Sequence, residues 1–300
     1  MQKLIRIAAL FFLQAAFISC ATLSLPSQNP KEYETAQYIP ENPDWQNASE
    51  NGEICFFSFE NPTLPLRYTV AKIDLRAKNL QLVAYPNSGT QISTKDFSFD
   101  GITIKDFQRQ SGAFIAINTT QYAKANPFFS RKRKIIGLQK SEGTLFSPPI
   151  SRYAALSLCY TQDNELKAKC ISYQDEKSAD SDFAIGGFFM ILSGGELFDS
   201  SGKNFSYTSR NSRTAAGVSS DGQTLFLLAV QGEKRKKSAG LTYPECAKLL
   251  LALGANSAIE FDGGGSTGMI IAKKDAIKPQ SKRKNACYIG FLFTTNNIFN

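Results

Sequence analysis

The sequence predicts an α+β fold in which a mixed or antiparallel sheet carries a few packed helices. Short apolar runs are repeatedly joined by turn signals, of which Asp221-Gly222 is the strongest. Two further segments have helical spacing and begin with capping residues. The chain has 300 residues, of which 42% are apolar, so it is long enough to bury a substantial core. Many hairpins with few helices are typical of this fold class.

The strands are predicted mainly as hairpins. Residues 68–75 and 80–84 flank Arg76-Ala77-Lys78-Asn79, which predicts a first hairpin. Residues 154–173 predict a second, with its tip near residues 161–165. A third hairpin and three single strands are predicted from the remaining apolar runs. These runs cover residues 213–218 with 224–230, and residues 114–117, 183–192 and 286–294.

Two helices are predicted from capping pairs. Thr103 and Asp106 stand three residues apart at the start of the first helix. Thr242 and Glu245 form a capping box at the start of the second, which carries an apolar face. Residues 119–150 contain a basic run and a proline pair, so irregular surface is expected there.

The N-terminus resembles an export signal. Lys3 and Arg6 precede an apolar stretch that is too short to span a bilayer comfortably. Phe17-Ile18-Ser19-Cys20 is similar to a bacterial lipobox, which makes Cys20 the expected lipidation site. Cleavage near Ala21 and an uncleaved anchor are the alternatives. The expected organisation is a signal peptide over 1–20, a polar tether over 21–50 and a domain over 51–300, held by lipid at the periplasmic or outer face of a bacterial envelope membrane.

Composition excludes several kinds of chemistry. The chain contains no histidine, which rules out a Ser-His-Asp triad, a Cys-His pair and an HExxH zinc site. No cysteine spacing resembles a zinc site, and we expect no cofactor or metal. Cys159 and Cys170 flank a predicted hairpin tip and are expected to face each other across strands. The net charge of +8 suits solvated loops or an anionic membrane or polymer, and no nucleic-acid-binding module is present.

The most informative stretch runs from Ile259 to Ile271. An apolar strand ends at Asp262, three consecutive glycines follow at 263–265, and Ser266 and Thr267 precede a second strand. Consecutive glycines are typical of positions where a side chain would obstruct a close approach. One interpretation is that a ligand approaches the bare backbone amides here. A tight turn that needs positive φ is the other.

The order of motifs resembles the phosphodiester glycosidase family, the domain of the mammalian uncovering enzyme. The resemblance spans roughly Leu66 to Thr294. It rests on five segments in the family's order, namely Val70–Leu75, Phe114–Asn118, Phe183–Gly187 with Leu192–Gly195, Ser212–Gly217 and Leu241–Ser266. It implies an α+β fold and cleavage of a sugar-phosphodiester.

Two positions depart from the family pattern. The family usually has Asn-Gly-Gly where this chain has Asn118-Thr119-Thr120, and Asp-Gly where it has Gln231-Gly232. Threonine disfavours the positive φ that glycine supplies, and the loss of an aspartate removes a carboxylate. Both changes bear on catalysis more than on fold.

Cleavage at an anomeric carbon needs a carboxylate and a donor that holds the departing phosphate. Asp262 is the first candidate carboxylate, Glu260 the second, and Arg213 the candidate phosphate ligand because its guanidinium matches phosphate oxygens. Structural ion pairing is the alternative for Glu260 and Arg213. The expected substrate-binding residues are Asn118, Gly186, Gly187, Thr214, Gly263, Gly264, Gly265 and Ser266.

The expected function is therefore an exported glycosidase acting on a sugar-1-phosphodiester or a related envelope glycan linkage. The alternatives are a glycan- or phosphate-binding lipoprotein of the same fold without turnover, and a metal-dependent phosphodiesterase attacking phosphorus. A sugar-phosphate or glycan substrate and a membrane, reached through the lipid, are the expected partners. The sequence does not indicate an oligomeric state.

Overall fold

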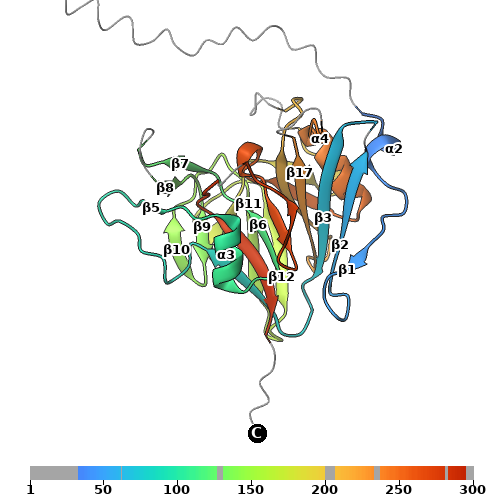
Figure 1. Ribbon diagram of the computed structural model, residues 1–300. Helices are drawn as coiled ribbons and strands as arrows, with labels where there is room; N and C mark the ends of the chain where they lie inside the picture. The colour runs from blue at the N-terminus through green and yellow to red at the C-terminus, as the bar shows by residue number, and fades with distance from the viewer. Residues whose placement is uncertain are drawn as a thin grey trace, which may run out of the picture. The chain divides into compact units, whose positions relative to one another are not determined.

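Antiparallel strands and three α-helices make up the described part of the chain, which confirms the α+β fold class. The computed structural model describes residues 33–61, 63–126, 131–199, 207–232, 237–280 and 283–294. The predicted signal peptide and Cys20 lie outside these residues. Figure 1 shows the strands stacked as sheets, with α4 (Tyr243–Ala252) and α3 (Ile104–Ser111) lying over different strands.

The largest sheet has eight strands. In spatial order they are β1 (Gln46–Asn47), β2 (Ile54–Asn61), β3 (Leu66–Asp74), β17 (Thr224–Gln231), β16 (Arg213–Val218), β18 (Ser257–Glu260), β14 (Met190–Ser193) and β15 (Glu196–Leu197).

Two sheets of five strands and one of three complete the fold. The first is β20 (Lys274–Ile277), β19 (Met269–Ile271), β6 (Ile115–Asn118), β21 (Tyr288–Phe293) and β4 (Leu80–Tyr85). The second is β10 (Thr144–Ser147), β9 (Gln139–Ser141), β13 (Phe183–Gly186), β11 (Ala155–Tyr160) and β12 (Leu166–Ile171). The three-stranded sheet is β5 (Phe99–Asp100), β8 (Lys132–Ile135) and β7 (Tyr122–Lys124).

The eight-stranded sheet is buried on both faces, as β17 illustrates. Leu225 and Leu227 join a core cluster shared with strands of both five-stranded sheets. Phe226 and Leu228, which alternate with them, join a second cluster with Leu249 of α4. Because successive side chains of a strand point to opposite faces, one apolar run serves both clusters. A smaller cluster lies under α3.

Both predicted helices are confirmed with their caps. The Thr103 hydroxyl accepts a hydrogen bond from the Asp106 amide, and Gly112 ends α3 in the left-handed region. Thr242 and Glu245 form the capping box of α4. The hairpins β11–β12 and β16–β17 are also confirmed by antiparallel pairing.

The first predicted hairpin is wrong. β3 pairs with β2 and β17, whereas β4 pairs with β21 in a five-stranded sheet. The turn residues are present, but the chain crosses there from one sheet to another. Leu82 of β4 and Ile73 of β3 therefore belong to the same core cluster but are not paired in a ladder.

The expectation of irregular surface over residues 119–150 is also wrong, because β7, β8, β9 and β10 lie there. Thr120 and Gln139 are buried and bond to each other at 2.7 Å between Oγ1 and Oε1. Buried polar residues that bond to one another give the sequence a polar composition, which is also typical of a surface loop.

Cys159 and Cys170 do not face each other. Cys159 is opposite Lys167 and Cys170 is opposite Leu156, so the two thiols lie on different faces of the hairpin. All five cysteines of the described residues are free.

The folded unit begins before residue 51. The described residues from Tyr33 onward belong to one compact unit, which contains the helix α2 (Thr35–Tyr38) and the strand β1. Tyr38 is fully buried and its carbonyl accepts a hydrogen bond from the Tyr68 hydroxyl at 2.7 Å. The second half of the expected tether is thus part of the domain. In the described part of the chain, no helix has both the length and the apolar character needed to cross a membrane.

Candidate active site at the glycine loop

The glycine loop, residues 261–268, connects the eight-stranded sheet to a five-stranded sheet. β18 ends at Glu260 and β19 begins at Met269. The Asp262 amide donates to the Thr119 carbonyl at 2.8 Å, which ties the loop to the end of β6. The candidate carboxylate is therefore held where two sheets meet.

Asn118 fixes this loop from three directions. Its amide nitrogen donates to the Asp262 carbonyl at 2.6 Å, and its side-chain oxygen accepts from the Gly268 amide at 2.9 Å. The same oxygen accepts from the Thr214 hydroxyl at 3.1 Å, and that hydroxyl also lies 3.2 Å from the Thr267 hydroxyl. Asn118 and Thr214 are buried and occupied by these bonds. Their contacts position the loop.

Packing explains two of the three glycines. A Cβ on Gly263 would lie 2.7 Å from the Ser212 carbonyl oxygen, and one on Gly265 would lie 2.5 Å from Gln280 Oε1. Gly264 adopts a φ of 56°, which disfavours other residues. The protein's own atoms and a turn therefore account for the glycines. The turn reading of this stretch is supported.

The loop still presents bare amides. The Gly264 amide donates to the Ser212 carbonyl at 2.9 Å. Within the described residues, the amides of Gly263 and Gly265 have no acceptor. Two N–H groups without an acceptor, one on each side of Gly264, are a suitable anchor for an anion.

Asp262 lies partly buried in a basic and polar environment. Burial raises the pKa of its carboxyl to about 6, against the opposing effects of the Ser266 hydroxyl and the Arg283 guanidinium. Arg283 is exposed, and its guanidinium carbon lies 6.0 Å from the Tyr122 ring centroid. The Asp262 carboxylate is therefore influenced by one hydroxyl group and one cation, and the Tyr122 ring lies beside that cation.

Glu260 and Arg213 form a different environment on the α4 face of the eight-stranded sheet. Glu260 is opposite Ala215, whose side chain packs in the cluster with α4. Arg213 Nη1 lies 4.0 Å from Glu260 Oε1, and both side chains are buried. Neither oxygen of Glu260 has a hydrogen-bond partner among the described residues, and burial raises its pKa to about 8 despite Arg213.

Arg213 is held by protein atoms. Its Nε donates to the Leu241 carbonyl at 3.1 Å and its Nη2 to the Ser209 carbonyl at 2.6 Å. Its guanidinium carbon lies 3.8 Å from the Tyr243 ring centroid. Such a group is fixed in place, and these contacts favour a structural role over direct contact with a phosphate.

Gly186 and Gly187 serve close packing. Their amides donate to the carbonyls of Leu138 and Ala154, both at 2.8 Å. Added Cβ atoms would lie 2.6 Å from the Leu138 oxygen and 2.7 Å from the Glu260 oxygen. Their amides are thus engaged in the backbone network, and they are not available to a substrate.

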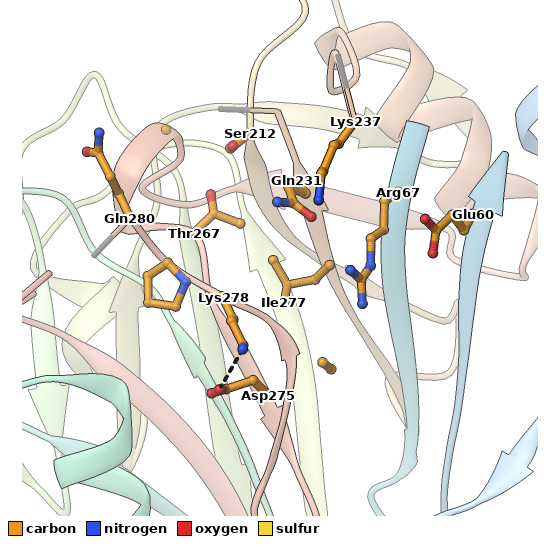
Figure 2. Close-up of a pocket in the computed structure, with 13 residues that line it drawn as sticks. Glu60, Arg67, Ser212, Gln231, Lys237, Thr267, Asp275, Ile277, Lys278 and Gln280 are labelled. Carbon is orange, nitrogen blue, oxygen red and sulfur yellow. Dashed lines mark ion pairs between the residues drawn. The ribbon is translucent and has the colours of Figure 1, made fainter. Parts of the chain in front are cut away.

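A cavity of about 740 Å³ lies beside the glycine loop, between the end of the eight-stranded sheet and β20 (Figure 2). Gly264 and Thr267 contribute to its wall from the loop. Asp262 is not among its lining residues, which are Glu60, Arg67, Ser212, Gln231, Lys237, Gly264, Thr267, Asp275, Ala276, Ile277, Lys278, Pro279 and Gln280. Gln231 stands here, where the family pattern has an aspartate.

Sequence reasoning missed Arg283 as a site residue. It lies in a basic stretch that resembles an ordinary solvated loop, and only the fold brings it to Asp262. The threonines at 119 and 120 cause no backbone strain, since neither has a positive φ. Among the described residues, no group of three His, Cys, Asp or Glu side chains is arranged to hold a metal ion.

Comparisons with known proteins agree with this architecture. A search of curated proteins finds no match. Three solved structures are similar at the level of the fold, with TM-scores of 0.59, 0.58 and 0.58. A hypothetical protein from Synechocystis is 16% identical, and the match covers 81% of this chain and 62% of that one.

The other two similar structures are a bacterial protein and the catalytic domain of an animal enzyme. A Burkholderia pseudomallei protein named as exported is 15% identical, with 76% of this chain and 74% of that one covered. The catalytic domain of zebrafish N-acetylglucosamine-1-phosphodiester alpha-N-acetylglucosaminidase, auto-inhibited by its pro-peptide, is 16% identical, with 83% and 87% covered. The phosphodiester glycosidase family model matches residues 100–292. The chain therefore belongs to the phosphodiester glycosidase family.

Proposed function

We propose that this protein is an exported hydrolase that cleaves the bond between the anomeric carbon of a sugar and a phosphodiester oxygen. Family membership supports the reaction class. The lipobox-like Phe17-Ile18-Ser19-Cys20 supports attachment to a bacterial envelope membrane through a lipid on Cys20. The substrate is a sugar-phosphate or an envelope glycan linkage.

Asp262 acts as the general base. A water oxygen forms a bond to the anomeric carbon while the bond from that carbon to the phosphate oxygen breaks. The electron pair leaves with the phosphate, and a water proton passes to Asp262. A phosphate is already a weak base, so a strong general acid is not required. A pKa of about 6 leaves Asp262 ionised at neutral pH and a better proton acceptor than an ordinary aspartate.

Arg283 and the amides of Gly263 and Gly265 hold the departing phosphate. A guanidinium and two N–H groups supply charge-assisted hydrogen bonds where negative charge develops. Arg213 takes a positioning role, because its donors are bound to carbonyls. Glu260 is buried beside Arg213, and its raised pKa keeps the carboxyl mainly protonated at neutral pH.

One observation carries the proposal: Asp262, a carboxylate with a raised pKa, adjoins two backbone amides without an acceptor in the described chain. Shifted carboxyl groups beside anion donors are characteristic of catalytic sites.

The test is hydrolysis of UDP-N-acetylglucosamine by the purified full-length protein in detergent, followed by product identification. Cleavage at carbon predicts free sugar and UDP, whereas attack on phosphorus gives sugar-1-phosphate and UMP. Asp262→Asn should lower kcat by roughly 10²–10⁴-fold, the contribution of a general base. Asp163→Asn, on an exposed hairpin tip, is the control. Sugar-1-phosphate as product, or full activity of Asp262→Asn, would contradict the proposal.

A second candidate is a binding protein of the same fold without turnover. Gln231 favours it, because it places an amide in the cavity where the family pattern has a carboxylate. Binding of the nucleotide sugar without products, and with an unchanged Kd in Asp262→Asn, would support this candidate.

A further inference from the structure

The cavity beside the glycine loop has a row of three polar side chains on one wall (Figure 2). Glu60 pairs with Arg67 across β2 and β3, and Arg67 pairs with Gln231 across β3 and β17. Paired residues of antiparallel strands project from the same face of a sheet. The three side chains therefore stand next to one another at the end of the eight-stranded sheet.

Two cations of this cavity form no ion pair with a described residue. Arg67 and Lys237 are exposed, and neither forms an ion pair within the described part of the chain. Figure 2 shows Lys237 extending toward Gln231, beside Arg67. Glu60 is the neighbouring carboxylate on this wall, so Arg67 and Lys237 together leave an excess of positive charge that attracts a negatively charged ligand.

A third cation is only partly compensated. Lys278 Nζ lies 3.9 Å from Asp275 Oδ2, and the same oxygen is 2.9 Å from Lys105 Nζ. One carboxylate is thus shared by two lysines. The Lys278 side chain is 77% exposed, so its amino group is free to turn toward a ligand.

The size and lining of the cavity fit more than a lone phosphate. Its volume of about 740 Å³ lies in the range of small-molecule sites, roughly 300–1,000 Å³. Ile277 and Pro279 add apolar surface, which suits the carbon face of a sugar ring. Glu60 and Gln231 offer oxygens that accept hydrogen bonds from hydroxyl groups.

We propose that this cavity binds a neighbouring anionic unit of a repeating sugar-phosphate chain, so that the substrate is a linear anionic polymer rather than an isolated diester. The glycine loop is the shared element, because it carries Asp262 and also contributes Gly264 and Thr267 to the cavity wall. The identity of the chain rests on the proposed function. The recognition of negative charge rests on Arg67, Lys237 and Lys278.

The binding test uses an oligomer of N-acetylglucosamine units joined by 1-phosphodiesters, with inorganic tripolyphosphate as a charge-only probe. Calorimetry on the full-length protein compares Arg67→Gln/Lys237→Gln with Lys167→Gln/Lys169→Gln. The control lysines are exposed on β12 and line a different cavity. Loss of Arg67 or Lys237 should each weaken Kd for the oligomer about tenfold, as expected for hydrogen bonds to charged groups. Equal affinity of the two double variants would overturn the proposal, as would equal affinity for both probes.

A kinetic test separates this proposal from the proposed function. In Arg67→Gln/Lys237→Gln, KM for the oligomer should rise about a hundredfold, roughly tenfold for each cation, while kcat/KM for UDP-N-acetylglucosamine stays unchanged. If the protein hydrolyses the nucleotide sugar but the oligomer KM does not depend on these cations, the polymer proposal is overturned. The proposed function is then unaffected. Oligomer binding that depends on the cations, without hydrolysis of either substrate, would support the cavity and contradict the proposed function.

Discussion

Arg213 and Glu260 form a buried ion pair, with 4.0 Å between Nη1 and Oε1 and with 5% and 1% of their side chains exposed. The pair lies under α4, on the face of the eight-stranded sheet opposite Thr214 and Asn118. Removal of Glu260 leaves the Arg213 guanidinium as a buried charge, and removal of Arg213 leaves a buried carboxyl group without a hydrogen-bond partner among the described residues. We therefore expect substitutions in this pair to change the stability of the fold more than the catalytic rate.

Arg213→Met should destabilise the fold by about 3–5 kcal/mol, the usual result of breaking a buried pair. Urea unfolding followed by circular dichroism measures this change. Arg109→Met is the matched control, because Arg109 pairs with Asp106 on the exposed surface of α3 and should cost less than about 1 kcal/mol. A variant of wild-type stability with a raised KM would instead identify Arg213 as a substrate ligand.

Glu260→Gln should change how stability depends on pH. Burial raises the folded-state pKa of Glu260 to about 8, above its value of 4.5 in an unfolded chain. The folded state therefore binds more protons than the unfolded state between these values, and stability falls as the pH rises from about 5 to 8. The neutral amide removes this contribution, so Tm should vary less with pH in Glu260→Gln. A wild-type slope in the variant would show that Glu260 does not titrate in this range.

Arg283→Gln should shift the pH profile of activity. If Asp262 is the base, kcat/KM rises with pH and reaches half of its maximum near pH 6, where the carboxyl loses its proton. Arg283 favours the ionised form, so its removal should move this midpoint to higher pH and lower kcat/KM. Lys284→Gln, at the neighbouring position, should leave the midpoint in place. If the midpoint does not move in Arg283→Gln, Arg283 does not influence the ionisation of the Asp262 carboxyl.

Two glycines of the loop should respond differently to alanine. Gly263→Ala places Cβ 2.7 Å from a backbone oxygen of Ser212, which cannot move without displacing β16. Gly265→Ala meets the end of the flexible Gln280 side chain at 2.5 Å, which can turn away. Overpacking against backbone costs about 1–3 kcal/mol, so Gly263→Ala should be the less stable variant in urea. Gly89→Ala, where the nearest atom is 3.6 Å away, controls for the general effect of alanine.

Local signals in the sequence were sufficient for the helices and for the hairpins with short turns. Thr103 and Thr242 act as caps through bonds within a few residues, so their roles are readable from spacing. The pairing of β4 with β21 depends on residues more than two hundred positions apart. No turn signal records such a contact, which explains the wrong hairpin at residues 76–79.

The site was predictable in part. Asn118, Thr214 and Asp262 were selected from motifs, and hydrogen bonds join them in the structure. The division between an α4 face and a loop face was not predictable, since Arg213 and Thr214 are adjacent in sequence and point to opposite sides of a strand. Arg283 carried no signal beyond a positive charge in a basic stretch.

The buried Tyr38 has a practical consequence for the length of a recombinant fragment. Truncation at residue 51 would remove Tyr38 and Trp45 from the aromatic packing around Phe57 and Tyr68. It would also take away the Tyr33 amide, which donates to the fully buried Glu245 carboxylate at 3.0 Å. A crystallisation or assay fragment should accordingly start upstream of Tyr33, because a shorter one would expose apolar surface and remove one of the hydrogen bonds to Glu245 of α4.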